Sequence, residues 1–331
     1  MADEVTAAFR TFPDIICPMS LCLITGAAGF IGSTLAERLL SDGHQVRGVD
    51  CFTGYYPRPV KERNLAGLLK HPRFTFSDTD LASGDLGGSV QDVEYVFHQA
   101  GQPGVLPSWG RMFDQYVSNN IIATQRLLEA LKDRPIKRFM FASSSTIYGD
   151  AQELPVRETS LPRPIVPYGV TKLAAEHLVN LYHYNFGLPA VILRYFSVYG
   201  PRQRPDMAFH KFIGAIARGE TIQLYGDGEQ TRDATFVGDI VQANVLAMRA
   251  GAEADGGVFN IGGGEQATVH HIIHEMEKLI ERSAHLERVA PKAGEVRHQW
   301  ADTTLARERL GFAPSVSLYE GLRRQVEWQL S

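Results

Sequence analysis

A glycine-rich stretch, Thr25-Gly26-Ala27-Ala28-Gly29-Phe30-Ile31-Gly32, lies between an apolar run at 21–25 and a segment with helical spacing at 33–41. The apolar run predicts a strand, and the spacing of the next segment predicts a helix that ends near Gly43. Three glycines at intervals of three residues allow a close backbone approach to a ligand, and the following helix N-terminus favours negative charge. The arrangement predicts a phosphate-binding turn that opens a Rossmann-type fold.

The second predicted strand, 45–50, ends on Asp50, 24 residues after Gly26. A carboxylate at this point can accept hydrogen bonds from both hydroxyls of an adenosine ribose, and it repels a 2′-phosphate. No arginine that would bind such a phosphate stands next to Asp50 in the sequence. These residues favour NAD over NADP as the cofactor; the alternative is a tight turn followed by a surface acid.

Strand and helix patterns alternate through the rest of the first half. This alternation is typical of βαβ units, and it predicts an α/β fold with a doubly wound parallel sheet covered on both faces. We expect further strands at 73–77, 95–98, 139–143 and 190–195, and long helices at 119–132 and 168–184.

The character of the chain changes after Gly200, where a loop rich in proline and arginine begins. We predict an N-terminal extension at 1–20, either disordered or packed on the surface, and a dinucleotide-binding Rossmann domain at 21–196. Residues 197–331 are assigned mainly to a smaller C-terminal α/β substrate-binding domain, which ends in an amphipathic helix at 318–330.

Composition narrows the class of protein. The 331 residues carry a net charge of −4, so the basic excess typical of proteins that bind nucleic acid or anionic membranes is missing. No apolar run approaches the ~20 residues that span a bilayer. The three cysteines, Cys17, Cys22 and Cys51, have neither the number nor the spacing of a disulfide framework or a zinc site. We therefore expect a cytoplasmic protein without a metal.

Tyr168 and Lys172 stand four residues apart in the second long predicted helix. This spacing sets a phenol and an amine on one face, one turn apart. A nearby ammonium lowers the pKa of a phenol, so Tyr168 is a candidate general base. The pattern alone also fits a half-buried aromatic beside a solvated lysine; Ser144, which follows a predicted strand upstream, favours the catalytic interpretation.

These motifs together resemble the extended short-chain dehydrogenase/reductase family, within the NAD-dependent epimerase/dehydratase group, over about 21–329. The resemblance implies that Ser144, Tyr168 and Lys172 are catalytic and that Tyr168 and Lys172 also contact the cofactor. Gly101 departs from the family's alanine in the stretch His98-Gln99-Ala100-Gly101. The cofactor-binding residues implied by the resemblance are Gly26, Gly29, Phe30, Ile31, Gly32, Asp50, Asp80, Leu81, Gln99, Ala100 and Asn120.

The stretch Ser144-Ser145-Thr146 separates this chain from two related groups. Family members that dehydrate the sugar resemble Thr-Asp-Glu here, and uronate decarboxylases resemble Thr-Ser-Glu. This chain has no carboxylate at these positions. What remains is oxidation and return of a hydride, which is epimerisation, or a one-way keto-reduction.

The stretch 197–208 resembles that of uronate 4-epimerases. On that match Ser197 and Arg204 bind the sugar's C6 carboxylate, with Ser145 and Thr146 completing the pocket; alternatively, Arg204 orders its own loop or contacts a phosphate. The resemblance also implies that Arg232 and Arg297 clamp the nucleotide diphosphate, although any single arginine can be a mere surface charge. Asp302 would reach the nucleotide ribose.

We therefore predict a nucleotide-sugar 4-epimerase that converts UDP-glucuronate to UDP-galacturonate with bound NAD. The alternatives are a 4-epimerase of a neutral UDP-sugar, a 4-keto-reductase of a dTDP- or UDP-deoxysugar, and a non-enzymatic relative that binds nucleotide. The resemblance further implies a homodimer that forms through the helices starting near Asn119 and Tyr168.

Overall fold

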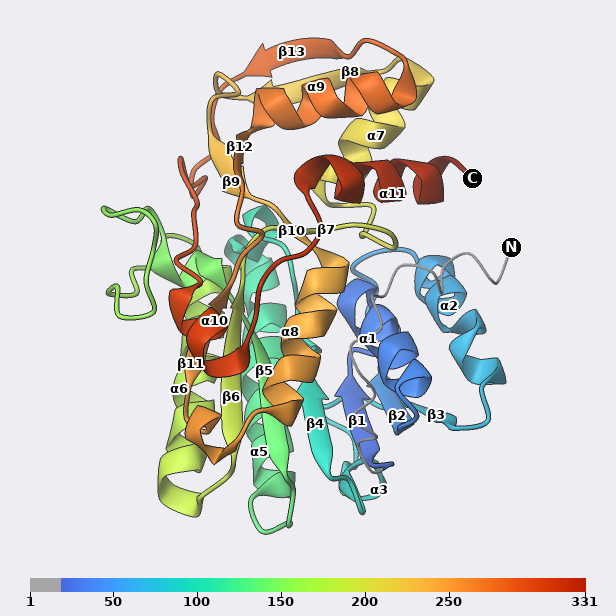
Figure 1. Ribbon diagram of the computed structural model, residues 1–331, viewed down its shortest axis with the longest axis vertical. Coiled ribbons are helices and arrows are strands. Elements are labelled where there is room, and N and C mark those ends of the chain that lie inside the picture. The colour runs from blue at the N-terminus through green and yellow to red at the C-terminus, as the bar shows by residue number, and fades with distance from the viewer. Residues whose placement is uncertain (1–18) are drawn as a thin grey trace.

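A seven-stranded parallel sheet forms the centre of the computed structural model, which describes residues 19–331 (Figure 1). Almost all of the expected N-terminal extension, residues 1–18, lies outside the described residues. The strands follow the order β11-β6-β5-β4-β1-β2-β3. Their bounds are β1 (Leu21–Thr25), β2 (Gln45–Asp50), β3 (Phe74–Asp78), β4 (Tyr95–His98), β5 (Arg138–Ser144), β6 (Ala190–Tyr195) and β11 (Val258–Ile261).

The strand order reverses next to β1. From β1 the chain adds β2 and then β3 on one side, and it then crosses to β4 and continues outward to β5 and β6. Ligands of open α/β sheets bind in the crevice beyond the carboxyl ends of the strands at such a switch point. The predicted Rossmann-type doubly wound sheet is confirmed.

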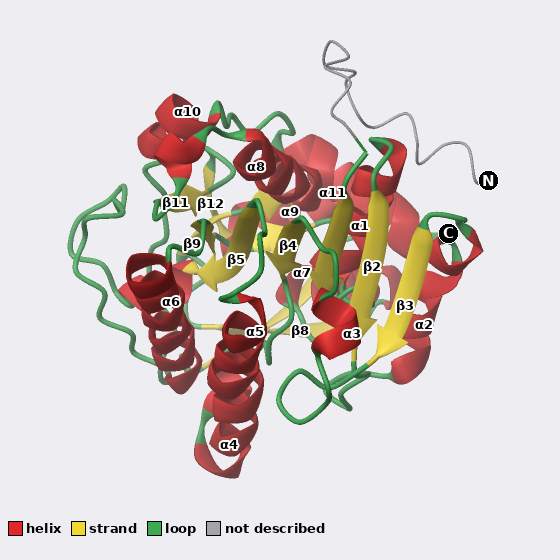
Figure 2. Ribbon diagram, turned by 90° about the horizontal axis from the view of Figure 1, so that it is seen from below, coloured by secondary structure: helices red, strands yellow, loops and turns green. Residues whose placement is uncertain are grey.

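Helices cover both faces of the sheet (Figure 2). Apolar side chains of α1, α8 and α10 form the core on one face, and those of α3, α5 and α6 form the core on the other. The bounds are α1 (Phe30–Ser41), α2 (Arg58–Ala66), α3 (Gly87–Val90), α4 (Phe113–Tyr116), α5 (Ala123–Leu131), α6 (Pro167–Phe186), α7 (Ala208–Arg218), α8 (Val237–Arg249), α9 (Val269–Ile280), α10 (Thr304–Leu310) and α11 (Leu318–Leu330).

The long helix expected at 119–132 differs from the prediction in its first turns. The helical path begins with α4, passes through a π-helical segment, Val117–Ile122, and continues as α5. Asn120 lies in the π-helical segment, and its amide bonds to the backbone of Gln102. π-helical turns are rare and often mark functional sites, because they redirect side chains that a regular helix would place elsewhere. Hydrophobic periodicity does not report such a turn.

A smaller part of the chain sits above the carboxyl ends of the strands (Figure 1). Its helices α7, α9 and α11 share an apolar core with strand residues such as Ile222 and Leu224. Three short two-stranded pairings complete it: β7 (Val198–Tyr199) with β10 (Thr235–Phe236), β8 (Thr221–Tyr225) with β13 (His285–Val289), and β9 (Thr231–Asp233) with β12 (Gln266–Thr268).

The chain passes between the two parts more than once. After the predicted boundary at residue 196, α8, β11 and α10 return to the layer of the large sheet, where β11 pairs with β6. Residues on the C-terminal side of position 196 therefore contribute to both parts of the structure. Among the described residues, no helix is long and apolar enough to cross a membrane.

Candidate active site

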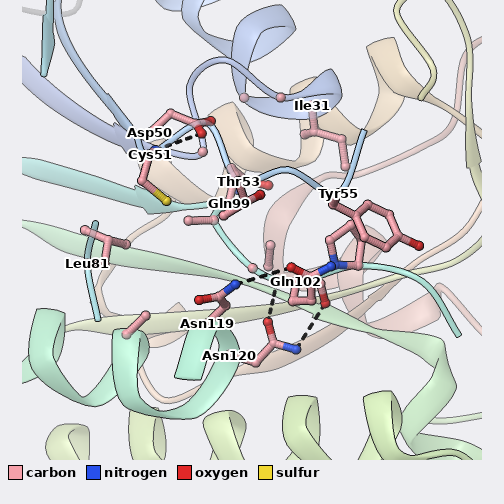
Figure 3. A pocket seen from close by; sticks show the side chains of 18 of the residues that line it. Ile31, Asp50, Cys51, Thr53, Tyr55, Leu81, Gln99, Gln102, Asn119 and Asn120 are labelled. Atoms are coloured by element: carbon pink, nitrogen blue, oxygen red, sulfur yellow. Dashed lines mark hydrogen bonds between the residues drawn. The ribbon is translucent and has the colours of Figure 1, made fainter. Parts of the chain in front are cut away.

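A cavity opens at the switch point of the sheet and continues toward α6 (Figure 3). It brings together residues from the glycine-rich turn, the ends of β2 and β4, the π-helical segment and α6. All of the predicted cofactor-binding residues line it: Gly26, Gly29, Phe30, Ile31, Gly32, Asp50, Asp80, Leu81, Gln99, Ala100, Asn120, Tyr168 and Lys172. Arg204 lines it as well, whereas the other predicted substrate-binding residues do not.

The glycine-rich turn fits a pyrophosphate. Gly26 has φ +72°, and a Cβ there would lie 2.8 Å from the backbone nitrogen of Ala100. A Cβ at Gly32 would lie 2.1 Å from the carbonyl oxygen of Gly26. Helix α1 begins at Phe30 with no side-chain cap and no acidic residue in its first turn, so its first N–H groups are free of side-chain acceptors. Such a helix start favours a bound anion.

Asp50 stands at the end of β2 and lines the cavity. Its Oδ2 accepts from the backbone N–H of Ala28 at 3.2 Å, and its Oδ1 accepts from those of Cys51 and Phe52 at 2.9 and 3.1 Å. The structure adds a cation that the local sequence did not indicate. The Nζ of Lys61 lies 3.3 Å from Oδ1 of Asp50, with both side chains almost fully buried.

The floor of the cavity is a network of amides (Figure 3). The backbone N–H of Gln102 donates to Oδ1 of Asn120 at 2.6 Å, and Nδ2 of Asn120 donates to Oγ1 of Thr171 at 3.0 Å. Asn119 donates to the side chain of Gln102 at 3.3 Å. Because Thr171 belongs to α6, these hydrogen bonds connect the floor of the cavity to the helix that carries Tyr168.

Tyr168 and Lys172 lie on consecutive turns of α6, and the hydroxyl of Ser144 acts on the pKa of Tyr168. Burial raises the pKa of Tyr168, while Ser144 and the positive charge of Arg204 lower it. The ammonium of Lys172 lies 4.4 Å above the ring of Phe141, and its effect on the pKa of Tyr168 stays a prediction. Burial lowers the pKa of Lys172 to about 8.

A buried ion pair supports Lys172 from one turn further along α6. Glu176 accepts from Nε and Nη2 of Arg194 at 3.0 and 2.8 Å, and it also bonds Ser143. The negative charge of Glu176 raises the pKa of Lys172 against the effect of burial. Arg194 also donates to the hydroxyl of Tyr148 at 2.7 Å, which links α6 to the strand-to-loop stretch that carries Ser144.

Arg204 reaches the catalytic end of the cavity from the loop before α7. Its Nε and Nη2 each lie 2.9 Å from an oxygen of Asp206, and its guanidinium lies 5.9 Å from the centre of the Tyr55 ring. Its charge acts on Tyr168. The pair with Asp206 agrees with the alternative in which Arg204 orders its own loop. The same arginine also lies near enough to Tyr168 to act on its pKa.

Four of the remaining predicted substrate residues lie in or next to one segment, 296–302, and none of these four lines the cavity. Ser197 donates to Gln299 at 3.0 Å, and Arg232 donates to the carbonyl of Val296 at 3.0 Å. Arg297 forms an exposed pair with Asp227, at 2.7 and 2.8 Å, and Asp302 lies 3.2 Å from Arg157. Ser145 is buried behind Ser144, whereas Thr146 is half-buried and donates to the hydroxyl of Ser144 at 2.9 Å.

Several residues that line the cavity were not predicted. They lie in the loop after β2 and the helix α2 that follows it, in the loop after β4, in the π-helical segment and at the end of β6. Sequence spacing alone gave no reason to select them. The adjacent tyrosines that follow Asp50 were the one available signal, because exposed aromatic residues in a loop after a parallel strand often contact a ligand. These residues are Thr53, Tyr55, Tyr56, Lys61, Gln102, Asn119 and Tyr195.

The fold and the cavity define a dinucleotide-binding enzyme of the Rossmann class, with a tyrosine and a lysine of α6 among the lining residues. Residues 22–262 match the NAD dependent epimerase/dehydratase family, and the chain belongs to this family. Its use of NAD and its enzymatic character follow from this membership together with the site.

Similar proteins cover nearly the whole chain. The UDP-glucuronic acid 4-epimerase of Bacillus cereus, solved in complex with UDP-glucuronic acid and NAD, is 44% identical with a TM-score of 0.91, over 94% of this chain and 99% of that one. The UDP-glucuronate 4-epimerase of Thermodesulfobacterium geofontis is 36% identical over 94% of this chain and 96% of its own length. The uncharacterized UDP-glucose epimerase YtcB of Bacillus subtilis is 44% identical over 92% and 96% respectively.

Proposed function

We propose that this protein is a UDP-glucuronate 4-epimerase, which interconverts UDP-glucuronate and UDP-galacturonate. The observation that carries the proposal is the position of Arg204, a guanidinium that lines the cavity and acts on the pKa of Tyr168. An arginine fork matches a carboxylate, and a neutral sugar offers no charge to it. The relatives solved or named with UDP-glucuronate support the same substrate.

Residues around the switch point would hold NAD. The turn at Gly26, Gly29 and Gly32 with the start of α1 would hold the pyrophosphate, and Asp50 would hold the adenosine ribose. Asn120 and Lys172 line the opposite end. When bound, NAD supplies a reversible hydride acceptor at C4 of the sugar.

Tyr168 serves as the general base and acid for the sugar 4-hydroxyl. Its phenolate takes the hydroxyl proton as C4 becomes a ketone, and the phenol returns a proton when C4 is reduced again. Ser144, whose hydroxyl lowers the pKa of Tyr168, would hold the same oxygen. The positive charge of Arg204 favours the phenolate that this step needs.

The substrate contacts divide between the two ends of the sugar nucleotide. Arg204 with Ser145, Thr146 and Ser197 would hold the C6 carboxylate. This restraint also matters chemically, because a 4-keto uronate is a β-keto acid that can lose carbon dioxide. Arg232 and Arg297 would clamp the diphosphate, and Asp302 would contact the nucleotide ribose. A firm hold on the diphosphate lets the keto sugar turn and present its other face.

We also propose a homodimer that forms through α6 and the helical path that ends in α5. Apolar side chains on the outer face of α6 support it: Val170, Leu181 and Tyr184 are 47, 55 and 86% exposed. Leu181→Glu should then shift the mass measured by light scattering from that of a dimer to that of a monomer. A cytoplasmic location remains a prediction from the cysteine content.

The proposed chemistry is tested with UDP-glucuronate carrying deuterium at C4. Return of the same hydride predicts UDP-galacturonate that keeps the deuterium at C4, with no label from the solvent. Loss of the label, or release of carbon dioxide in place of an epimer, would argue against the proposal.

A further inference from the structure

The adenosine end of the cavity contains a buried lysine whose role the epimerase reaction does not explain. Lys61 lies on α2, eleven residues after Asp50, and it is 5% exposed. Its Nζ lies 3.3 Å from Oδ1 of Asp50 and 3.4 Å from Oγ1 of Thr53. Burying an ammonium is costly unless a partner offsets the cost, so Asp50 is what holds Lys61 in this position.

Asp50 itself is already well supplied with hydrogen-bond donors. Three backbone N–H groups, those of Ala28, Cys51 and Phe52, donate to its carboxylate without Lys61. The backbone alone thus orients the carboxylate for a ribose. Asp50 therefore does not need the ammonium of Lys61 for its orientation. If a dinucleotide with a 2′-phosphate were bound, that phosphate would lie near this ammonium.

We propose that Lys61 is a latent 2′-phosphate site, which the carboxylate of Asp50 masks by pairing with its ammonium. NADP requires a cation beside the ribose and no competing carboxylate. This chain meets the first requirement and fails the second. Replacing Asp50 with a small neutral residue leaves the ammonium of Lys61 facing the ribose pocket with Thr53 as its remaining bonded partner.

The other charges at this end do not supply the same function. Asp80 lines the cavity, but its carboxylate accepts from the backbone of Ala82 and from Ser83, at 2.8 and 2.7 Å. Arg58, also on α2, is exposed, and it pairs with Glu62 at 2.7 Å. Lys61 is therefore the cation to test, and Arg58 is the matched control on the same helix.

The test compares the dissociation constants of NAD and NADP by calorimetry on the full-length protein, stripped of bound dinucleotide. Four variants are needed: Asp50→Ser, Lys61→Met, the double variant, and Arg58→Met. Asp50→Ser should lower the ratio of the NADP constant to the NAD constant by on the order of 100-fold, because it removes a repulsion and frees a charge. The double variant should lose about 10-fold or more of that change. Arg58→Met should leave the ratio unchanged.

Equal ratios in Asp50→Ser and in the double variant would overturn the proposal, since Lys61 would then contribute nothing to phosphate binding. An unchanged ratio in Asp50→Ser would overturn it as well. Thermal unfolding of each variant verifies the fold, and Asp50→Asn replaces Asp50→Ser if the latter unfolds. Because the readout is dinucleotide binding, the result does not depend on which nucleotide-sugar the enzyme epimerises.

Discussion

Arg204 and Asp206 form a two-pronged ion pair in which Nε and Nη2 of the arginine each lie 2.9 Å from a carboxylate oxygen. The pair sits beside Tyr55 and close enough to Tyr168 for the arginine to lower the tyrosine's pKa. The pair shows that a carboxylate can satisfy this guanidinium with two parallel contacts. We expect the C6 carboxylate of the substrate to share or replace the contacts that Asp206 makes.

Arg204→Gln should therefore discriminate between substrates. We expect the KM for UDP-glucuronate to rise by about 10- to 100-fold, because one charge-assisted contact to the carboxylate is lost. The KM for UDP-glucose, measured in the same assay, should change by less than about threefold. Arg218→Gln is the control, since Arg218 pairs with Glu220 on the surface. Equal losses on both substrates would remove Arg204 from carboxylate binding.

Tyr168→Phe should remove the base and leave the fold intact. We expect kcat to fall by about 10²- to 10⁴-fold on any UDP-sugar, which is the usual contribution of a positioned acid–base group. Binding of UDP-glucuronate, followed by calorimetry, should change little. Tyr319→Phe, at a position on α11 that is 50% exposed, should behave like the wild type. Substantial turnover by Tyr168→Phe would assign the base to another group.

Lys172 makes a prediction about stability and pH. Burial lowers its pKa to about 8 in the folded chain, whereas a lysine in the unfolded chain titrates near ~10.4. Between these values the unfolded state binds more protons, so the contribution of Lys172 to the free energy of unfolding rises with pH in this window. The free energy of unfolding of the wild type, minus that of Lys172→Met, should thus increase by up to about 3 kcal/mol from pH 8 to pH 10.4.

Urea unfolding of the dinucleotide-free protein at several pH values measures this difference. The tyrosines whose pKa values burial raises are common to both proteins, so their titration cancels. A difference that stays flat across the window would show that Lys172 keeps an ordinary pKa in the fold.

Several positions reveal what the sequence could and could not predict. Short continuous apolar runs located six of the seven strands of the large sheet within a residue or so, because strands buried on both faces consist of such runs. The seventh, β11, was not predicted. The turn at Gly26, Asp50 and the Tyr168–Lys172 pair followed from spacing, because each depends on local backbone geometry. Spacing did not predict the role of Lys61, because its contact with Asp50 depends on how α2 packs over the end of β2.

The pKa of Tyr168 depends on burial and on Arg204, which helical spacing cannot reveal. Helical spacing places an amine one turn away, but it cannot specify that the amine lies above Phe141 and that the phenol is buried. One partner that lowers this pKa, Arg204, lies 36 residues further along the chain and reaches Tyr168 only through the tertiary fold. The domain boundary at 196 has the same weakness, because β11 returns to the sheet from the C-terminal half.

The pair of Glu176 and Arg194 predicts a large loss of stability. Its side chains are 3 and 7% exposed, and Glu176→Ala leaves a buried guanidinium without its carboxylate. We expect the free energy of unfolding to fall by about 3–5 kcal/mol. Glu220→Ala, which breaks the exposed pair with Arg218, should cost less than about 1 kcal/mol. A small effect of Glu176→Ala, by urea unfolding, would mean that water or Tyr148 compensates the arginine.

The most direct test of the account is to incubate the purified protein with UDP-glucuronate, without added NAD, and to resolve the products by chromatography. The account predicts a mixture of UDP-glucuronate and UDP-galacturonate, formed with dinucleotide that remains bound through purification. No conversion, either alone or with NAD added, would contradict it. A neutral UDP-sugar would then become the substrate to test, and the carboxylate role of Arg204 would be withdrawn.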